Sequence, residues 1–223
     1  GVNLAWDACL SEGGLQSKTS ACLSNAGASV AWGSFVAGGD HPDFVGCEVI
    51  IDLQAEGTTL PDWWQFFNSG SCRKNALSVS FDFTSAPQTN CSDPWLGQGV
   101  GGLAAYQTVT TIPAVPSGMA NSARIKLAAA LSAANPLGAA TEYYCFRLII
   151  SNAGTVGSGS CVGCGTPVCL VLSEVKVAES TGPVERLTSP VAGSAIGWQG
   201  GQAVCAAMAP QNATWGQIQT ILR

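Results

Sequence analysis

Hydrophobic and polar residues alternate through much of the chain, and this two-residue period is its dominant pattern. Segment 77–83 shows it most clearly, because Leu, Val, Phe and Phe alternate there with Ser, Ser and Asp. Side chains two residues apart share one face of a strand, so this segment predicts a half-buried strand. Similar patterns predict strands at 2–6, 30–36, 47–53, 104–111, 124–131, 142–151 and 168–178.

Clusters of Gly, Pro, Asn and Ser separate these segments, and such residues favour turns. Eight or so strands joined by turns predict a mostly β protein, an antiparallel β-sandwich or jelly roll. The stretch 179–194 is rich in Ser, Thr, Gly and Pro and predicts a connector. We therefore expect a sandwich domain at 1–180, followed by a connector and C-terminal docking tail at 181–223.

Helical patterns are few. Residues 61–67 begin with Pro and predict one short helical turn. In the tail, Trp215, Ile218, Ile221 and Leu222 follow helical spacing, so the tail is expected to end in a helical turn.

Ten cysteines, an even number, predict a disulfide framework and an oxidising location outside the cell. The chain begins with Gly1, so we expect a mature secreted protein from which a signal peptide has been removed. Short loops favour Cys9–Cys22 and Cys72–Cys91, and a Cys205 bond to a body cysteine such as Cys47 would clamp the tail. The connectivity stays open, and the candidates are Cys9, Cys22, Cys47, Cys72, Cys91, Cys145, Cys161, Cys164, Cys169 and Cys205.

The one dense cysteine cluster is Cys161, Cys164 and Cys169. Its Cys-x-x-Cys spacing suits a zinc site or a redox pair. A closed zinc site needs a second pair of ligands, and the chain has a single histidine. A loop crossed by disulfides is therefore the favoured interpretation.

Charged residues make up only 10% of the chain, against roughly 25% in ordinary soluble domains. The nine basic residues are scattered, which argues against nucleic acid or anionic lipid as a partner. Apolar runs are too short to predict a membrane span. A charge-poor surface favours coverage by neighbouring molecules, although a compact disulfide-rich domain also tolerates low charge.

Candidate chemistry is sparse. The sequence contains no Gly-x-Ser-x-Gly motif whose serine His41 could activate, so we expect His41 to be a loop residue. The neighbouring Asp40 and Asp43 could offer oxygens to calcium, and no other cofactor is expected. A hydrolase would need two converging carboxylates, for which the strand candidates are Glu48, Asp52, Asp82, Glu142 and Glu174. Nothing in the sequence brings two of them together, so we expect no enzyme activity.

Seven tryptophans offer a second functional interpretation. Trp63, Trp64, Trp95 and Trp198 lie in polar or Gly-rich contexts, where an exposed ring would stack on sugars. The alternative is that these rings fill the core or an interface.

Two resemblances bear on these alternatives. Residues 168–177, Val-Cys-Leu-Val-Leu-Ser-Glu-Val-Lys-Val, resemble the closing strand of carbohydrate-binding jelly-roll modules. The whole chain, from Asn-Leu-Ala-Trp at 3–6 to the ending at 214–223, resembles uncharacterised secreted bacterial proteins. That second resemblance implies secretion and no particular chemistry.

The sequence thus predicts an extracellular structural protein, a self-assembling subunit of a filament, sheath or surface layer whose partners are copies of itself. A secreted carbohydrate-binding, lectin-like module with a polysaccharide partner is the alternative. The assembly candidates are the alternating N-terminal residues and the apolar tail residues: Val2, Leu4, Trp6, Trp215, Ile218, Ile221 and Leu222. The sugar-stacking candidates of the alternative are Trp63, Trp64 and Trp95.

Overall fold

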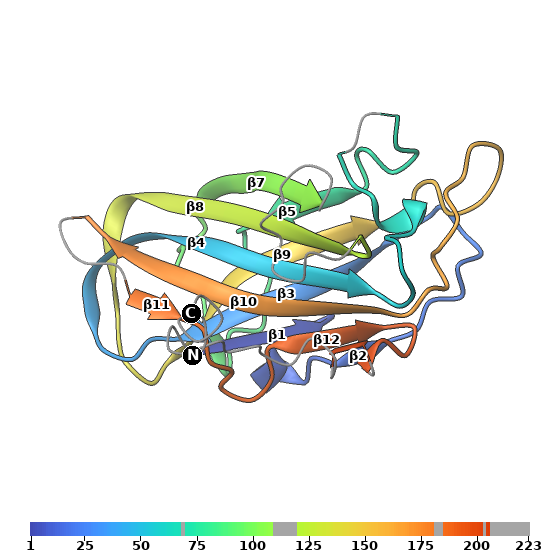
Figure 1. Cartoon of the computed structure of the whole chain (residues 1–223). Helices are drawn as coiled ribbons and strands as arrows, with labels where there is room; N and C mark the ends of the chain where they lie inside the picture. The colour runs from blue at the N-terminus through green and yellow to red at the C-terminus, as the bar shows by residue number, and fades with distance from the viewer. Residues whose placement is uncertain (68–69, 109–119, 181–184, 203, 206–223) are drawn as a thin grey trace, which may run out of the picture.

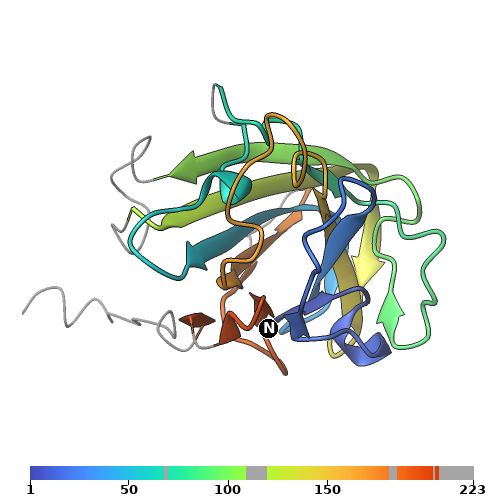
Figure 2. The same ribbon diagram turned by 90° about the vertical axis from the view of Figure 1, so that its right-hand side faces the viewer.

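Two β-sheets pack against each other in the computed structural model of the chain (Figures 1 and 2). The structure describes residues 1–67, 70–108, 120–180, 185–202 and 204–205. The mostly β fold predicted from the sequence is confirmed, and the facing sheets form a sandwich.

The first sheet has the strand order β1-β3-β9-β5, with β6 paired to β9. The second sheet has the order β2-β12-β10-β4-β8-β7, with β11 paired to β10. All pairings are antiparallel except β12–β2 and β6–β9. The strands of the first sheet are β1 (Val2–Trp6), β3 (Ala28–Val36), β5 (Leu77–Ser80), β6 (Cys91–Ser92) and β9 (Glu142–Ser151). Those of the second are β2 (Ser17–Lys18), β4 (His41–Ala55), β7 (Val100–Thr108), β8 (Ser122–Leu137), β10 (Val168–Glu179), β11 (Glu185–Leu187) and β12 (Ala195–Trp198).

All eight predicted segments contain strands, and in most of them alternation places an apolar row in the core. In β4, for example, Val49, Ile51 and Leu53 are all buried. The predicted helical turn at 61–67 is the 3-10 helix η2 (Asp62–Trp64), which follows Pro61. A second one, η1 (Leu10–Glu12), was not predicted. The predicted helical turn at 215–222 lies outside the described residues.

Two short strands, β11 and β12, lie beyond residue 180, in the region that the sequence assigned to the connector and tail. Both pair with β10, so the second sheet extends into this region. The part of the chain that the structure describes contains no helix long and apolar enough to cross a membrane.

Four tryptophans form the centre of one end of the core. The ring centroids of Trp63 and Trp198 are 5.5 Å apart, and Trp6 and Trp64 lie 5.9 and 5.8 Å from Trp198. All four side chains are fully buried. Burial of such large rings removes much apolar area from water and makes this cluster a main contributor to stability.

Four disulfides connect segments that are distant in sequence: Cys9–Cys91, Cys22–Cys164, Cys72–Cys161 and Cys169–Cys205. The predicted pairs Cys9–Cys22, Cys72–Cys91 and Cys47–Cys205 are therefore wrong. Short loops favour local pairing, but the sandwich brings remote loops together, and the first three bridges span 82, 142 and 89 residues. Cys205 does bond to a cysteine of the body, Cys169, as the clamping hypothesis required.

Candidate functional site

The ends of the two sheets are where a sandwich can accept another strand, since an edge strand carries unpaired backbone groups. At one end of the first sheet, β1 is covered by residues 189–193. Val2 N–H donates to the Ser189 carbonyl at 2.8 Å, and Leu4 N–H donates to that of Gly193 at 2.8 Å. This edge is closed by the chain itself.

The N-terminal assembly candidates are therefore corrected. Val2, Leu4 and Trp6 are fully buried inside their own sandwich, and the Gly1 ammonium donates to the Val36 carbonyl. The alternating pattern reflects a strand that is internal to the fold, with no apolar face left for a neighbour. The tail candidates Trp215, Ile218, Ile221 and Leu222 lie outside the described residues.

Two other edges are short. The first sheet ends at β5, which has four residues. The second sheet ends on one side at β2, which has two residues and carries Lys18, paired with Asp7 at 2.5 Å. Short strands and charged side chains are common means of protecting an edge from pairing with another chain.

Strands β6 and β11 are also sheet edges among the described residues, but they have only two and three residues. The edge at β7 is long and uncharged. Its nine residues, Val-Gly-Gly-Leu-Ala-Ala-Tyr-Gln-Thr, include neither a charged residue nor a proline. It lies at the end of the second sheet opposite β2 (Figure 1). Strand β5 runs nearby but belongs to the other sheet. From Val100 to Gln107, β8 is the one strand of the described chain that pairs with β7.

The inner side of β7 is fixed to the body. The Tyr106 hydroxyl donates a hydrogen bond to the Trp64 carbonyl at 2.5 Å, and the Tyr106 ring packs edge-on against Phe66. Burial raises the pKa of Tyr106, so this phenol stays protonated as a donor. A strand held in this way presents its outer edge in a fixed position, which favours pairing with an incoming strand.

The side chains exposed beside the first half of β7 are small and uncharged. Val100 pairs with Ala130 and Gly102 with Ala128, and both alanines are exposed. Val100 itself is 77% exposed. A β-bulge between Leu103 and Ala105 is the one feature of β7 that weakens an edge for pairing.

Several charged residues of the second sheet form ion pairs with one another. Arg124 binds Asp52 through two bonds of 2.8 and 3.0 Å. Lys176 lies between Glu48 and Glu174, at 3.2 and 3.6 Å, and these carboxylates raise its pKa. Carboxylates bound in this way are neutralised by a cation and do not form an acid and base pair.

The other two carboxylates considered for hydrolysis also have structural partners. Glu142 accepts hydrogen bonds from Asn3 at 2.8 Å and from Ser34 at 2.5 Å. Asp82 accepts from the hydroxyl and the backbone N–H of Thr84, which lower the pKa of that aspartate. Glu142 is therefore engaged in contacts within the fold, and the lowered pKa of Asp82 is the opposite of what a general acid requires.

His41 is not a loop residue, because it begins β4 and is buried. Its Nδ1 lies 2.9 Å from Glu179 and its Nε2 lies 2.7 Å from Glu185. Burial lowers the pKa of His41, but the bonds and charges of the two glutamates outweigh it and raise that pKa. The group is a partly buried cluster of ionisable side chains that joins β4, β10 and β11.

The two aspartates proposed for calcium are engaged separately. Asp40 accepts from the Ala139 N–H at 2.7 Å, and Asp43 accepts from the Ser180 hydroxyl. In the part of the chain that the structure describes, neither belongs to a cluster of metal-ligand side chains.

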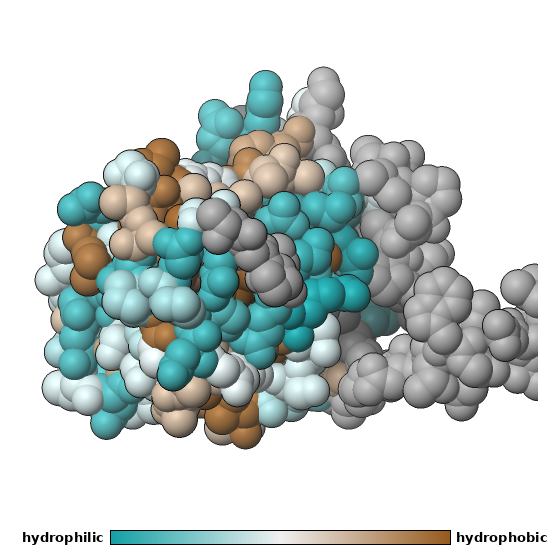
Figure 3. All heavy atoms as spheres, turned by 90° about the vertical axis from the view of Figure 1, so that its left-hand side faces the viewer, coloured by the Kyte–Doolittle hydropathy of each residue, from teal (hydrophilic) through white to brown (hydrophobic). Residues whose placement is uncertain are grey.

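Figure 3 views this end of the sandwich, where hydrophobic residues form separate small patches among hydrophilic ones.

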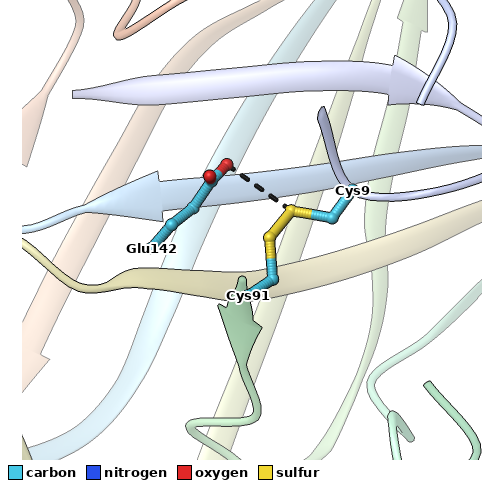
Figure 4. Close-up of side chains that lie close together, drawn as sticks. All are labelled: Cys9, Cys91 and Glu142. Atoms are coloured by element: carbon cyan, nitrogen blue, oxygen red, sulfur yellow. Dashed lines mark hydrogen bonds between the residues drawn. A yellow bond between two sulfur atoms is a disulfide. The ribbon is translucent and has the colours of Figure 1, made fainter. Parts of the chain in front are cut away.

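One cluster of metal-ligand side chains does occur among the described residues: Cys9, Cys91 and Glu142 (Figure 4). Its two sulfurs are joined in a disulfide, so neither offers the thiolate that binds a metal. The zinc and redox interpretations of Cys161, Cys164 and Cys169 fail for the same reason, since each is bonded to a different distant cysteine.

The sugar-stacking candidates are also corrected. Trp63, Trp64 and Trp95 are fully buried, as is Trp198, so none presents a ring to a ligand. The Trp63 indole N–H donates to Thr155 at 3.0 Å, and that of Trp95 donates to the Cys145 carbonyl at 3.1 Å. These rings fill the core, which is the alternative to sugar stacking that the sequence also allowed.

The sequence patterns did not identify the β7 edge as a candidate site. Its segment was predicted as a strand, but its place at the end of a sheet depends on tertiary structure. The absence of charge and proline between residues 100 and 108 is visible in the sequence, but it does not distinguish an edge strand from a central one. A comparison of the chain with protein-family models, curated proteins and solved structures finds no match to any of them.

Proposed function

We propose that the chain is an extracellular structural subunit that assembles with copies of itself through the outer edge of β7. The observation that carries this proposal is the contrast among the sheet edges. The edge at β1 is covered by the chain, those at β5 and β2 are short, and β7 is long, uncharged and paired on one side among the described residues.

A second copy is the occupant that the composition favours. Two β7 strands that pair antiparallel about a two-fold axis bring uncharged residues together, so no ionic group has to be desolvated. The low charge of the whole chain, 10%, also leaves little electrostatic repulsion between copies. Disulfides support an oxidising location outside the cell, where such a subunit would remain folded.

A two-fold contact through β7 gives a closed dimer, so a filament, sheath or layer needs a second contact. The apolar residues of the C-terminal tail, Trp215, Ile218, Ile221 and Leu222, are the candidates for it. Deletion of residues 206–223 should then reduce the assembly to dimers, which light scattering distinguishes from larger polymers.

A charged substitution in β7 tests whether this edge is the contact between copies. Ala104 is exposed and lies at the bulge, so Ala104→Lys should leave the fold intact but place an ammonium at the new pairing. We expect association to weaken at least about tenfold, which corresponds to about 1.4 kcal/mol. The matched control is Ala133→Lys, an exposed position of β8 beyond its pairing with β7.

Sedimentation velocity or light scattering over a wide concentration range measures the outcome. A wild-type chain that remains monomeric at high concentration contradicts self-assembly. If Ala104→Lys assembles as well as wild type, the chain still self-assembles, but β7 is not the contact.

A further inference from the structure

Two cysteines remain outside the four disulfides of the structure, and they face each other across the core. Cys47 belongs to β4 of the second sheet and Cys145 to β9 of the first. Their sulfur atoms are 3.5 Å apart. Both side chains are buried, with Cys47 3% exposed and Cys145 0% exposed.

The surroundings of this pair offer no other role for the two sulfurs. They do not belong to any cluster of three metal-ligand side chains in the described residues. Burial and the neighbouring Cys47 raise the pKa of the Cys145 thiol well above its ordinary value, which suppresses the nucleophilic thiolate. The Cys145 carbonyl accepts from the buried Trp95, whose ring packs against Phe44 of β4.

We propose that Cys47 and Cys145 form a fifth disulfide in the secreted protein, and that this bond joins the two sheets directly. A disulfide bond is about 2.05 Å long, so the sulfurs must approach by roughly 1.5 Å, within the range of side-chain rotation. None of the other four bridges links a strand of one sheet to a strand of the other. The loop closed by the new bond spans 98 residues.

The reaction is an ordinary thiol–disulfide exchange. Each thiol loses its proton, one S–S bond forms, and the two electrons reduce the disulfide of a protein oxidant to a dithiol. The same class of oxidant has to form the other four bridges. Because the folded pair is buried and protonated, oxidation takes place before the two sheets close over it.

The experiment counts thiols in protein secreted through an oxidising compartment. The chain is unfolded in guanidinium chloride without reductant, alkylated, and weighed by intact mass spectrometry. We expect no alkylated cysteine before reduction and ten afterwards, with a digest that yields one peptide pair linked through Cys47 and Cys145. Two alkylated cysteines before reduction, or a link from either residue to another cysteine, would overturn the proposal.

Two variants guard against an ambiguous count. Cys145→Ala should expose one alkylatable thiol, which maps to Cys47, whereas the double variant Cys47→Ala/Cys145→Ala should expose none and keep four bridges. If the wild type is bridged, the double variant also unfolds at a lower guanidinium concentration than oxidised wild type. Reduction of wild type should abolish that advantage only after the protein has been unfolded, because the bond is inaccessible in the folded state.

Discussion

The hydroxyl of Tyr106 in the edge strand β7 lies 2.5 Å from the carbonyl oxygen of Trp64, beside the tryptophan cluster. This bond connects the proposed assembly edge to the buried tryptophan cluster of the core. Tyr106→Phe removes the donor and leaves that carbonyl without this partner. We expect a loss of about 1–2 kcal/mol in the free energy of unfolding, measured by guanidinium titration. No measurable loss would show that the bond does not hold β7.

The tryptophans considered for sugar binding should behave as core residues. Trp63 is fully buried and stacks on Trp198, and its ring centroid lies 3.7 Å from the guanidinium carbon of Arg73. Trp63→Ala should lower the free energy of unfolding by about 3–5 kcal/mol. The exposed Leu23 gives a control, since Leu23→Ala should change stability by about 0.5 kcal/mol or less. A stable, folded Trp63→Ala chain would reopen the surface interpretation.

The His41 cluster predicts a pH dependence of stability. Both ring nitrogens face carboxylates, an arrangement that the imidazolium satisfies with two donors. The folded-state pKa of His41 is raised above about 6.5, the value expected when unfolded, although burial of the ring opposes this shift. Its contribution is therefore fully present below pH 6.5 and is lost as the pH rises through the folded pKa.

The measurement compares wild type with His41→Gln by thermal unfolding between pH 5.5 and pH 9. We expect wild type to be the more stable chain at pH 5.5 and the difference to shrink toward pH 9. A difference that stays constant, or that grows with pH, would show that His41 is not held as an imidazolium.

Glu12 predicts the opposite dependence at acid pH. Its carboxylate accepts bonds from the Thr89 hydroxyl and from the backbone N–H groups of Asn90, Cys91 and Thr89, which lower its pKa to about 2. This contribution is present above pH 4.5 and is lost as the pH falls toward 2. Wild type should therefore exceed Glu12→Gln in stability at pH 6, and the two should converge near pH 2. Parallel curves over that range would contradict the assignment.

The alternating segments predicted most of the sandwich because each has one apolar face, which tertiary packing buries. The two longest strands were predicted too short. The early part of β4 contains Pro42 and Gly46, and its pairing is interrupted by bulges around Phe44. The late part of β8, through Asn135 and Pro136, lacks alternation. Bulges and polar pairings leave no two-residue period to detect.

The candidate site was beyond the reach of sequence patterns for a different reason. A strand of Val, Gly, Leu and Ala residues reads the same in the centre of a sheet as at its edge. Likewise, the sequence around Trp63 does not reveal that the ring turns inward, and the spacing of Cys9 and Cys22 favoured a loop that the sandwich does not form. Each of these features is decided by contacts between residues far apart in the chain.

Hydrogen–deuterium exchange of the native protein directly reports pairing at β7, because pairing at an edge protects its backbone amides. Exchange is followed by mass spectrometry in dilute and concentrated samples, with Ala104→Lys as the matched sample that should not assemble. If copies assemble through β7, peptides covering Val100–Gln107 exchange more slowly when the wild type is concentrated, and no such slowing occurs in the variant. Exchange in β7 that is the same at all concentrations, in a sample that light scattering shows to be assembled, would contradict assembly through β7.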